Sequence, residues 1–328
     1  MKNRTLKSLL EDPLIAEIAP DAISKMDLSK EEYYNWTLQE IADKMGWRSL
    51  ERGFSRLFEI AERGKYYYKL YSEEECINDP SKKNVNFVFF PSDDSKADQR
   101  PFILLIPGGG FVNVWNISEG WPIAQHFNAK GYHAVILTYQ VDVERSPIRA
   151  LGDITRAMEI LRAHKEGFRL DPDKYITCGF SAGGYITCLW NTEKGYRAFG
   201  IAKPKACFPV YPATSYRLMD AEEWDEGEDK DEFAREDLGC TMEEACNSCF
   251  EIPEHVEGFP PTAIFVSDGD ELVDPQHSKL LAASLDKAGI PCMLEVGPTG
   301  GHGFADGTGM CMEGWPERAI EWFEQVNG

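Results

Sequence analysis

The feature that most constrains the fold of this chain is a series of short apolar runs that alternate with helical segments. The runs are "PFILLI", "HAVILTY", "KYITCG", "KACFPVY", "TAIFVS" and "PCMLEV", with helices expected near residues 121, 147, 181, 275 and 316. Strands that are apolar on both faces are typical of parallel sheets buried between helices. The alternation therefore predicts an α/β fold with a mostly parallel central sheet and helices on both faces. Before it, "KYYYKLYS" and "NVNFVFFP" are predicted to pair as strands.

Residues 1–62 have a different pattern, which indicates a helical N-terminal segment ahead of a catalytic domain over 63–328. Ser29 and Glu32 have the spacing of a capping box that would open a helix. An apolar stripe follows at helical spacing, formed by Tyr34, Leu38, Ile41 and Met45. Packing against the main domain would account for this stripe, and so would a cap over an active site; the two are compatible.

A second departure from the alternation is the acidic insertion 217–258, which includes "MDAEEWDEGEDKDEFARED". A solvated surface excursion accounts for its charge. An insertion that follows a strand on the C-terminal side of a sheet also lies near the ligand crevice of α/β folds. We therefore expect this insertion and the N-terminal helices to lie over that edge of the sheet and to shape a pocket there.

Charge and cysteine usage limit the partners and the compartment of the protein. The formal net charge of −21 over 328 residues disfavours nucleic acid and anionic membrane surfaces as partners. We find no run of about 18 apolar residues that would span a bilayer, and no secretion signal near the N-terminus. Nine cysteines, an odd number scattered along the chain, are typical of reduced thiols. We therefore expect a cytoplasmic protein.

One group of side chains has an order that could bind zinc: Cys240, Cys246, Cys249 and His255. Structural zinc sites usually combine two short ligand motifs, and only one is present here. Free cysteines in a variable insertion are the favoured interpretation. We expect no metal and no cofactor.

The motif "GFSAGG" places Ser181 between glycines at positions 179 and 183. A G-x-S-x-G pattern alone arises by chance in about one chain in ten of this length. Here a predicted strand precedes it and a predicted helix follows it, which is the context of a nucleophile elbow. We therefore predict that Ser181 is a nucleophile, which requires a base to remove its proton.

Histidine and aspartate candidates for this chemistry follow two later strands. His302 lies in the glycine-rich loop "GPTGGHGF" after "PCMLEV", whereas its rival His277 lies on a predicted helix. The segment after "TAIFVS" supplies three candidate acids: Asp268, Asp270 and Asp274. The acid would hold the tautomer of the histidine and stabilise its charged form. The order Ser181, Asp270, His302 is nucleophile, acid, base.

Backbone N–H groups that would stabilise an oxyanion are expected at Gly109 and Gly110, in "LLIPGGGF", and at Ala182 beside the nucleophile. A phosphate-binding loop is the competing interpretation of the three glycines. It lacks the G-K-[ST] ending, and the acidic chain disfavours it.

Taken with "PGGGF", "GFSAGG", "DELVD" and "GGHGF", the chain from about residue 85 to the end resembles the α/β-hydrolase esterases and lipases. It is most similar to the acetylesterase-like branch near the hormone-sensitive-lipase-like enzymes. The resemblance implies Ser181 as nucleophile, Asp270 as acid and His302 as base, with the oxyanion hole at Gly109, Gly110 and Ala182. Lipase-like relatives often carry His and Asp where this chain has Pro107 and Phe180. These departures favour esterases of small or sugar-borne esters.

These observations predict a serine carboxylesterase that cleaves short acyl esters, including acetyl esters of carbohydrates, with a small-molecule ester as its partner. An amidase or peptidase on the same triad is one alternative, and a binding module without catalysis is another. Phe111 and Trp115 either narrow the acyl side of the pocket or belong to the core. The sequence leaves the oligomeric state open.

Overall fold

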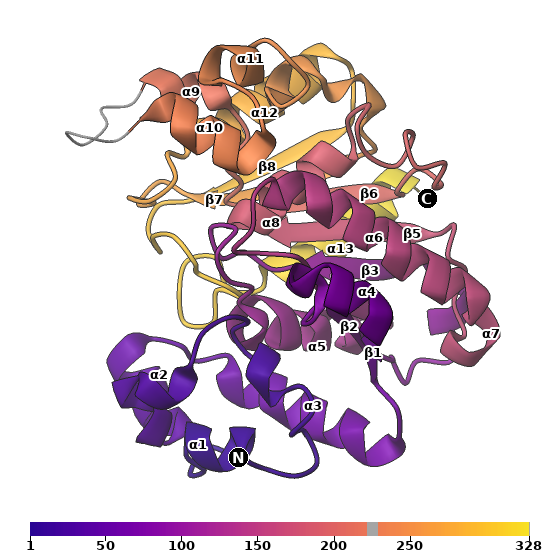
Figure 1. Cartoon of the computed structure of the whole chain (residues 1–328), viewed down its shortest axis with the longest axis vertical. Helices are drawn as coiled ribbons and strands as arrows, with labels where there is room; N and C mark the ends of the chain where they lie inside the picture. Colours follow the sequence, from indigo (N-terminus) through magenta and orange to yellow (C-terminus); the bar gives the residue numbers. More distant parts are fainter. Residues whose placement is uncertain (222–228, 328) are drawn as a thin grey trace.

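The fold is built around one eight-stranded sheet, which lies in the middle of the molecule in Figure 1. The computed structural model describes residues 1–221 and 229–327. The strands are β1 (Tyr67–Lys69), β2 (Asn86–Phe90), β3 (Phe102–Ile106), β4 (Ala134–Thr138), β5 (Tyr175–Phe180), β6 (Ala206–Val210), β7 (Thr262–Ser267) and β8 (Cys292–Gly297). Their spatial order is β1-β2-β4-β3-β5-β6-β7-β8; β2 is antiparallel to both neighbours, and the other pairs are parallel. The predicted mostly parallel sheet is confirmed.

Helices cover both faces of the sheet because successive side chains of each buried strand point to opposite sides. In β3, Ile103 and Leu105 join one apolar cluster, while Leu104 and Ile106 join the other. The first cluster contains side chains of α3 (Leu50–Arg63), α5 (Trp121–Ala129) and α13 (Trp315–Asn327). The second contains side chains of α6 (Ser146–Ala163), α8 (Ser181–Trp190) and α12 (Gln276–Lys287). Two short helices, α4 (Glu73–Asn78) and α7 (Lys165–Phe168), lie in connections.

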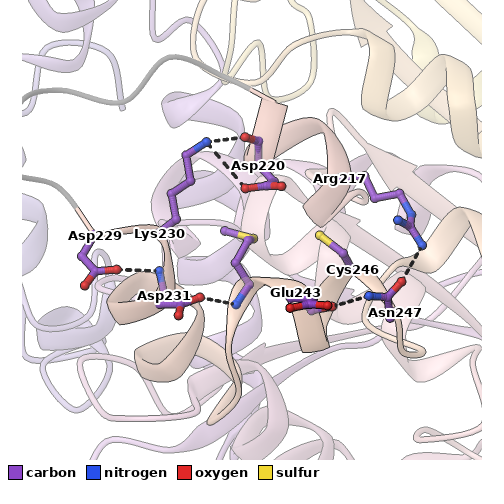
Figure 2. Close-up of a pocket in the computed structure, with 9 residues that line it drawn as sticks. Arg217, Asp220, Asp229, Lys230, Asp231, Glu243, Cys246 and Asn247 are labelled. Atoms are coloured by element: carbon purple, nitrogen blue, oxygen red, sulfur yellow. Dashed lines mark hydrogen bonds and ion pairs between the residues drawn. The ribbon is translucent and has the colours of Figure 1, made fainter.

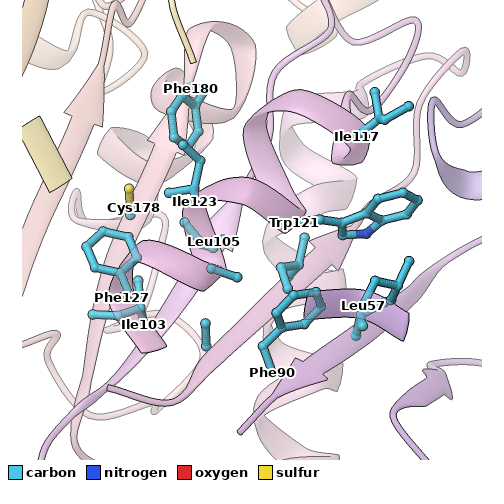
Figure 3. Packing of buried hydrophobic residues seen from close by; sticks show 14 of the residues in the cluster. Leu57, Phe90, Ile103, Leu105, Ile117, Trp121, Ile123, Phe127, Cys178 and Phe180 are labelled. Atoms are coloured by element: carbon cyan, nitrogen blue, oxygen red, sulfur yellow. The ribbon is translucent and has the colours of Figure 1, made fainter. Parts of the chain in front are cut away.

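The N-terminal segment packs on the first face through α3, and its other α-helices are α1 (Leu6–Leu10) and α2 (Leu38–Met45). Figure 3 shows Leu57 of α3 beside Trp121 of α5, within the same cluster as Phe90 of β2. The rings of Phe54 and Trp121 also meet edge to face, with centroids 5.4 Å apart. The first 62 residues therefore share the apolar core of the α/β domain.

The predicted start of the helix in this segment was wrong. Asp27 accepts a hydrogen bond from the N–H of Ser29, and short 3₁₀ turns occupy residues 28–30 and 32–35. The capping box forms instead between Thr37 and Glu40, whose carboxylate accepts from the N–H of Thr37 at 2.7 Å. The α-helix therefore begins at Leu38. Of the predicted stripe, Leu38 and Ile41 are buried, but Tyr34 precedes the helix and Met45 is 37% exposed.

The acidic insertion forms α9 (Tyr216–Ala221), α10 (Lys230–Leu238) and α11 (Met242–Cys246), and residues 222–228 lie outside the described residues. In Figure 1 it lies at the opposite end of the molecule from the N-terminal helices. Its apolar side chains, such as Leu238 and Met242, join the cluster on the α6 and α8 face. The N–H of Arg145 also donates to the carbonyl of Glu236. The described helices of the insertion thus pack on the α6 and α8 face of the sheet.

Within the described residues, no helix is both long enough and apolar enough to cross a membrane.

Leu57→Ala tests whether the N-terminal segment is part of the cooperative core. Leu57 is fully buried, so its truncation should lower the free energy of unfolding by about 2–5 kcal/mol. Thermal unfolding followed by circular dichroism should show a lower Tm for the main transition. Ile77→Ala, at a position 80% exposed, is the control and should leave Tm unchanged. A separate early transition beside an unshifted main one would mean that the segment folds independently.

Candidate active site

Ser181 lies at the sharp turn where β5 ends and α8 begins. Its φ is 50°, in the left-handed region that residues with a side chain rarely adopt. The turn brings Gly183 so close to β3 that a Cβ there would overlap the carbonyl oxygen of Ile106. Such a strained strand-to-helix turn exposes the serine hydroxyl above the sheet, as the sequence motif predicts.

The structure brings the predicted histidine and aspartate to this serine. His302 Nε2 lies 2.9 Å from Ser181 Oγ, and His302 Nδ1 lies 2.8 Å from Asp270 Oδ2. Asp270 is held by the N–H groups of Leu272 and Val273, which donate to its Oδ1 at 3.0 and 2.9 Å. With a proton on Nδ1, the histidine donates to Asp270 and accepts from Ser181. This arrangement prepares the serine for deprotonation.

The rival residues have other partners. His277 is buried, and its Nδ1 accepts the N–H of Ser215 at 3.0 Å; burial lowers the pKa of His277 to about 4. Asp274 accepts the N–H of Gln276 at the start of α12, and Asp268 pairs with Lys279 on the surface. None of the three has a hydrogen bond to Ser181 or His302.

A cavity of about 400 Å³ opens over Ser181 and His302. Gly109 and Gly110 line it, as expected for residues that would offer N–H groups to an oxyanion. Ala182 follows Ser181 in the first turn of α8, where N–H groups have no partner within the helix. The three predicted donors therefore lie on or next to the cavity that contains the serine.

Both the N-terminal segment and the loop after β3, residues 107–115, contribute walls to this cavity. This loop, which contains Gly108, Gly109 and Gly110, is called the glycine-rich loop from here on. Trp47 and Trp115 line it and meet edge to face, with ring centroids 5.6 Å apart. The remaining lining residues are mostly polar or small and come from residues 46–49, 118–119, 272 and 303–310. Phe111 is not among the described lining residues, because its ring packs against Tyr185 with centroids 6.3 Å apart. Of the two interpretations left open by the sequence, the position of Trp115 fits a pocket wall, and that of Phe111 fits the core.

The N-terminal segment also braces the glycine-rich loop through its backbone. The N–H of Ser24 donates to the carbonyl of Val114 at 3.0 Å, and the N–H of Ile117 donates to Ala22 at 2.8 Å. In addition, Asn116 donates from its amide to the carbonyl of Asp21 at 2.8 Å. The N-terminal segment, which we expected as a cap, thus lines the cavity and is hydrogen-bonded to the glycine-rich loop. The insertion contributes no described residue to this cavity, contrary to expectation, because it packs on the flank.

Sequence reasoning missed Glu119, which lies on a π-helical turn, Asn116–Gly120, directly before α5. It is only 7% exposed, lines the cavity, and accepts from the N–H of Gly108 at 2.6 Å and from the hydroxyl of Tyr211 at 2.8 Å. Burial raises the pKa of Glu119, while these two hydrogen bonds and His302 oppose the rise. A carboxylate within the apolar stretch after the glycine-rich loop was the available signal.

A larger hollow of about 890 Å³ lies on the insertion, away from Ser181 (Figure 2). Most of its described charged side chains have partners: Asp229 accepts the N–H of Asp231, and Asp231 accepts the N–H of Met242, each at 2.9 Å. Arg217 donates to Asn247 at 3.2 Å. Size alone does not make it a site, and the polar groups that converge on a reactive side chain lie in the smaller cavity.

The cysteines of the insertion do not assemble with His255. Within the described residues, no group of three or more His, Cys, Asp and Glu side chains has an arrangement that could hold a metal ion. All nine cysteines are free, and burial raises the pKa of the Cys246 and Cys249 thiols, which disfavours the thiolate that metals bind.

The strand order, the serine at the turn after β5, the aspartate after β7 and the histidine after β8 define an α/β-hydrolase fold. The sequence model of the BD-FAE family matches residues 88–285, which is more than half of the chain. The protein belongs to the BD-FAE family. The matched region contains Ser181 and Asp270 and ends before His302.

Similar proteins include enzymes named for xylan and acetyl esters. Endo-1,4-beta-xylanase B of Butyrivibrio fibrisolvens is 27% identical over 70% of this chain and 36% of its own length. An acetylxylan esterase of Xylanibacter ruminicola is 24% identical over 66% and 45%. The chain thus spans less than half of these curated relatives. The crystal structure of an acetyl ester-xyloside bifunctional hydrolase from Caldicellulosiruptor lactoaceticus has a TM-score of 0.64 and 25% identity, over 80% of this chain and 96% of that one.

Asp270→Asn should slow the reaction of Ser181 with a fluorophosphonate far more than Asp274→Asn. The amide at 270 can no longer hold the histidine tautomer that accepts the serine proton, and a loss of about 10⁴-fold is expected. Asp274→Asn is a matched control, since this carboxylate accepts the N–H of Gln276 and has no hydrogen bond to His302. Labelling rates measured by mass spectrometry test the assignment, which equal losses in both variants would refute.

Proposed function

We propose that the protein is a serine carboxylesterase that hydrolyses short-chain acyl esters. The observation that carries the proposal is the continuous hydrogen-bonded chain from Ser181 through His302 to Asp270, open to a cavity that Gly109 and Gly110 line. Each of these groups corresponds to a requirement of acyl transfer: a nucleophile, a base held by an acid, and donors for an oxyanion.

In the first half of the reaction, Ser181 Oγ attacks the ester carbonyl while His302 Nε2 takes its proton. Asp270 stabilises the imidazolium that forms. The carbonyl oxygen becomes an oxyanion, which the N–H groups at Gly109, Gly110 and Ala182 would meet. His302 then returns the proton to the departing alcohol, leaving Ser181 acylated.

In the second half, a water molecule takes the place of the alcohol. His302 removes one of its protons as the oxygen attacks the acyl-enzyme, and the same N–H groups stabilise the second oxyanion. The collapse of this intermediate returns the proton to Ser181 and releases the carboxylic acid. The cycle needs no group beyond the described side chains and water.

We propose acetyl esters of carbohydrates as the substrate class. Two aromatic walls, Trp47 and Trp115, border a cavity that also presents polar side chains from Arg48, Ser118 and Thr308. Such a mixture suits a sugar, which has both apolar ring faces and hydroxyl groups. The similarity to an acetylxylan esterase and to an acetyl ester-xyloside bifunctional hydrolase supports the same class.

We also propose that the protein works in a reducing compartment, the cytoplasm. Nine free cysteines support this proposal, because disulfides are rare where thiols are kept reduced. Five of them are buried, namely Cys178, Cys188, Cys207, Cys246 and Cys249, and burial raises the pKa of the Cys178 and Cys188 thiols.

Ser181→Ala should abolish hydrolysis of p-nitrophenyl acetate while leaving the fold intact. Loss of a triad nucleophile costs about 10⁶-fold in turnover in comparable enzymes. Ser248→Ala, on the insertion, is the control and should retain full activity. If Ser181→Ala keeps more than a few per cent of the wild-type activity after contamination is excluded, the nucleophile is elsewhere. A folded wild-type protein that neither hydrolyses esters nor reacts with a fluorophosphonate would instead be a binding module.

The walls of the cavity lead to a prediction on acyl length. The value of kcat/KM across p-nitrophenyl esters from acetate to decanoate should peak at about two to four acyl carbons, because Trp47 and Trp115 restrict longer chains. A permissive apolar site would instead gain about 0.8 kcal/mol for each added methylene. A maximum at eight carbons or more would contradict the short-chain proposal.

Matched variants locate the restriction. Trp115→Ala should move the maximum towards longer chains, since Trp115 lines the cavity. Phe111→Leu, on the same loop but packed against Tyr185, should leave the profile unchanged. An unchanged profile in Trp115→Ala would place the restriction at another wall.

A further inference from the structure

A buried carboxylate lies between the glycine-rich loop and the histidine of the proposed active site. The two oxygens of Glu119 accept from different parts of the site: Oε2 from the N–H of Gly108, and Oε1 from the hydroxyl of Tyr211. Among the described residues, Glu119 has no ion pair with a lysine or arginine, and these two donors together with the nearby imidazole of His302 compensate for its loss of water.

Keeping a carboxylate in this position is expensive for stability. A buried ionised group without a cation loses more solvation than two hydrogen bonds return, and burial accordingly raises the pKa of Glu119. An apolar side chain of similar volume would avoid that cost. A costly buried group at the wall of a reactive cavity points to a role in the chemistry.

The first hydrogen bond fixes the backbone that leads into the proposed oxyanion hole. Gly108 immediately precedes Gly109 and lies against the nucleophile: a Cβ on Gly108 would lie 2.9 Å from the Cβ of Ser181 and 2.6 Å from the carbonyl of Phe180. Its carbonyl accepts from the N–H of Trp115 at 3.1 Å, while its N–H is held by Glu119. Because the N–H and the carbonyl of Gly108 are both held, the N–H groups of Gly109 and Gly110 have a fixed orientation relative to Ser181.

The second hydrogen bond fixes the aromatic ring beneath the base. Tyr211 follows β6, and its ring lies against the imidazole of His302 with centroids 4.8 Å apart. The hydroxyl of Tyr211 donates to Glu119, so the ring cannot turn without losing its buried partner. One carboxylate thus anchors both the loop that faces the oxyanion and the ring that supports His302.

We propose that Glu119 is a positioning residue for this reaction: by accepting from Gly108 and Tyr211 together, it sets the glycine-rich loop and His302 in register around Ser181. The inference rests on the proposed esterase function. Positioning errors of this kind act on the transition state, since the oxyanion and the imidazolium exist only there. Loss of Glu119 therefore lowers kcat and leaves KM nearly unchanged.

The test compares Glu119→Met with Glu119→Gln in p-nitrophenyl acetate hydrolysis. Methionine has a similar volume and no strong acceptor, so kcat should fall by about 10²–10³-fold, the usual cost of losing an oxyanion donor, with KM within twofold. Glutamine can still accept from Gly108 and can donate to the oxygen of Tyr211, so kcat should stay within about tenfold of wild type. A kcat near wild type in Glu119→Met overturns the proposal. Equal losses in both variants also overturn it, because the charge and not the hydrogen bonds would then matter.

Glu251→Met is the matched control for burial. Glu251 is 1% exposed and accepts the N–H of Arg217 at 3.0 Å, on the insertion and outside the cavity. This variant should change Tm about as much as Glu119→Met does and leave kcat unchanged. A similar fall in kcat for Glu251→Met would show that the effect of Glu119→Met is general destabilisation.

Tyr211→Phe decides the question if Glu119→Met fails to fold. It removes the donor to Glu119 and leaves the ring against His302. A fall in kcat of about tenfold with KM unchanged supports the proposal, and an unchanged kcat overturns it. If the wild-type protein reacts with a fluorophosphonate but hydrolyses no ester, the proposed function fails, and the labelling rates of the same variants still decide the role of Glu119. If the wild type does neither, both proposals fail.

Discussion

The common direction of the parallel strands is the constraint on which this molecule depends. Because β3, β5, β7 and β8 run the same way, the loops after them meet at one edge of the sheet. That edge collects the glycine-rich loop, Ser181, Asp270 and His302 from four distant parts of the chain. The strained turn at Ser181 is tolerable only because the core on both faces holds β5 and α8 in place.

The candidate active site is built by the sheet and by two segments outside it. The sheet positions the side chains of the proposed triad, whereas the N-terminal segment and the loop after His302 line the cavity beside them. Arg52 of α3 connects the N-terminal segment to the loop that carries His302. Its guanidinium donates to Asp306 of that loop at 2.9 Å. His126 contacts the same carboxylate at 3.0 Å. The walls of the cavity are thus tied to the core by buried polar contacts.

What the sequence predicted follows from how local each signal is. Strands, helices and the turn at Ser181 depend on neighbouring residues, and the order of Ser181, Asp270 and His302 needs only the sheet to bring them together. Glu119 escaped notice because its partners, Gly108 and Tyr211, become neighbours only after folding. The same limit explains Phe111, whose loop turns its ring towards Tyr185, and the insertion, whose apolar side chains select the flank. The predicted capping box at Ser29 was wrong for a local reason, because neighbouring residues are also suitable N-caps. Asp27 accepts the N–H of Ser29, and Thr37 accepts the N–H of Glu40 at the start of the α-helix.

The fastening of the first residues to the glycine-rich loop has a consequence for how such proteins diverge. The region that matches the family begins at residue 88, yet Trp47 lines the cavity and residues 22–24 share backbone hydrogen bonds with residues 114–117. Residues that line the cavity therefore also lie outside the region that matches the family. That part is not freely exchangeable, however, because a transplanted segment must match the loop it supports. A change in the N-terminal segment and a change in the geometry of this loop are therefore linked.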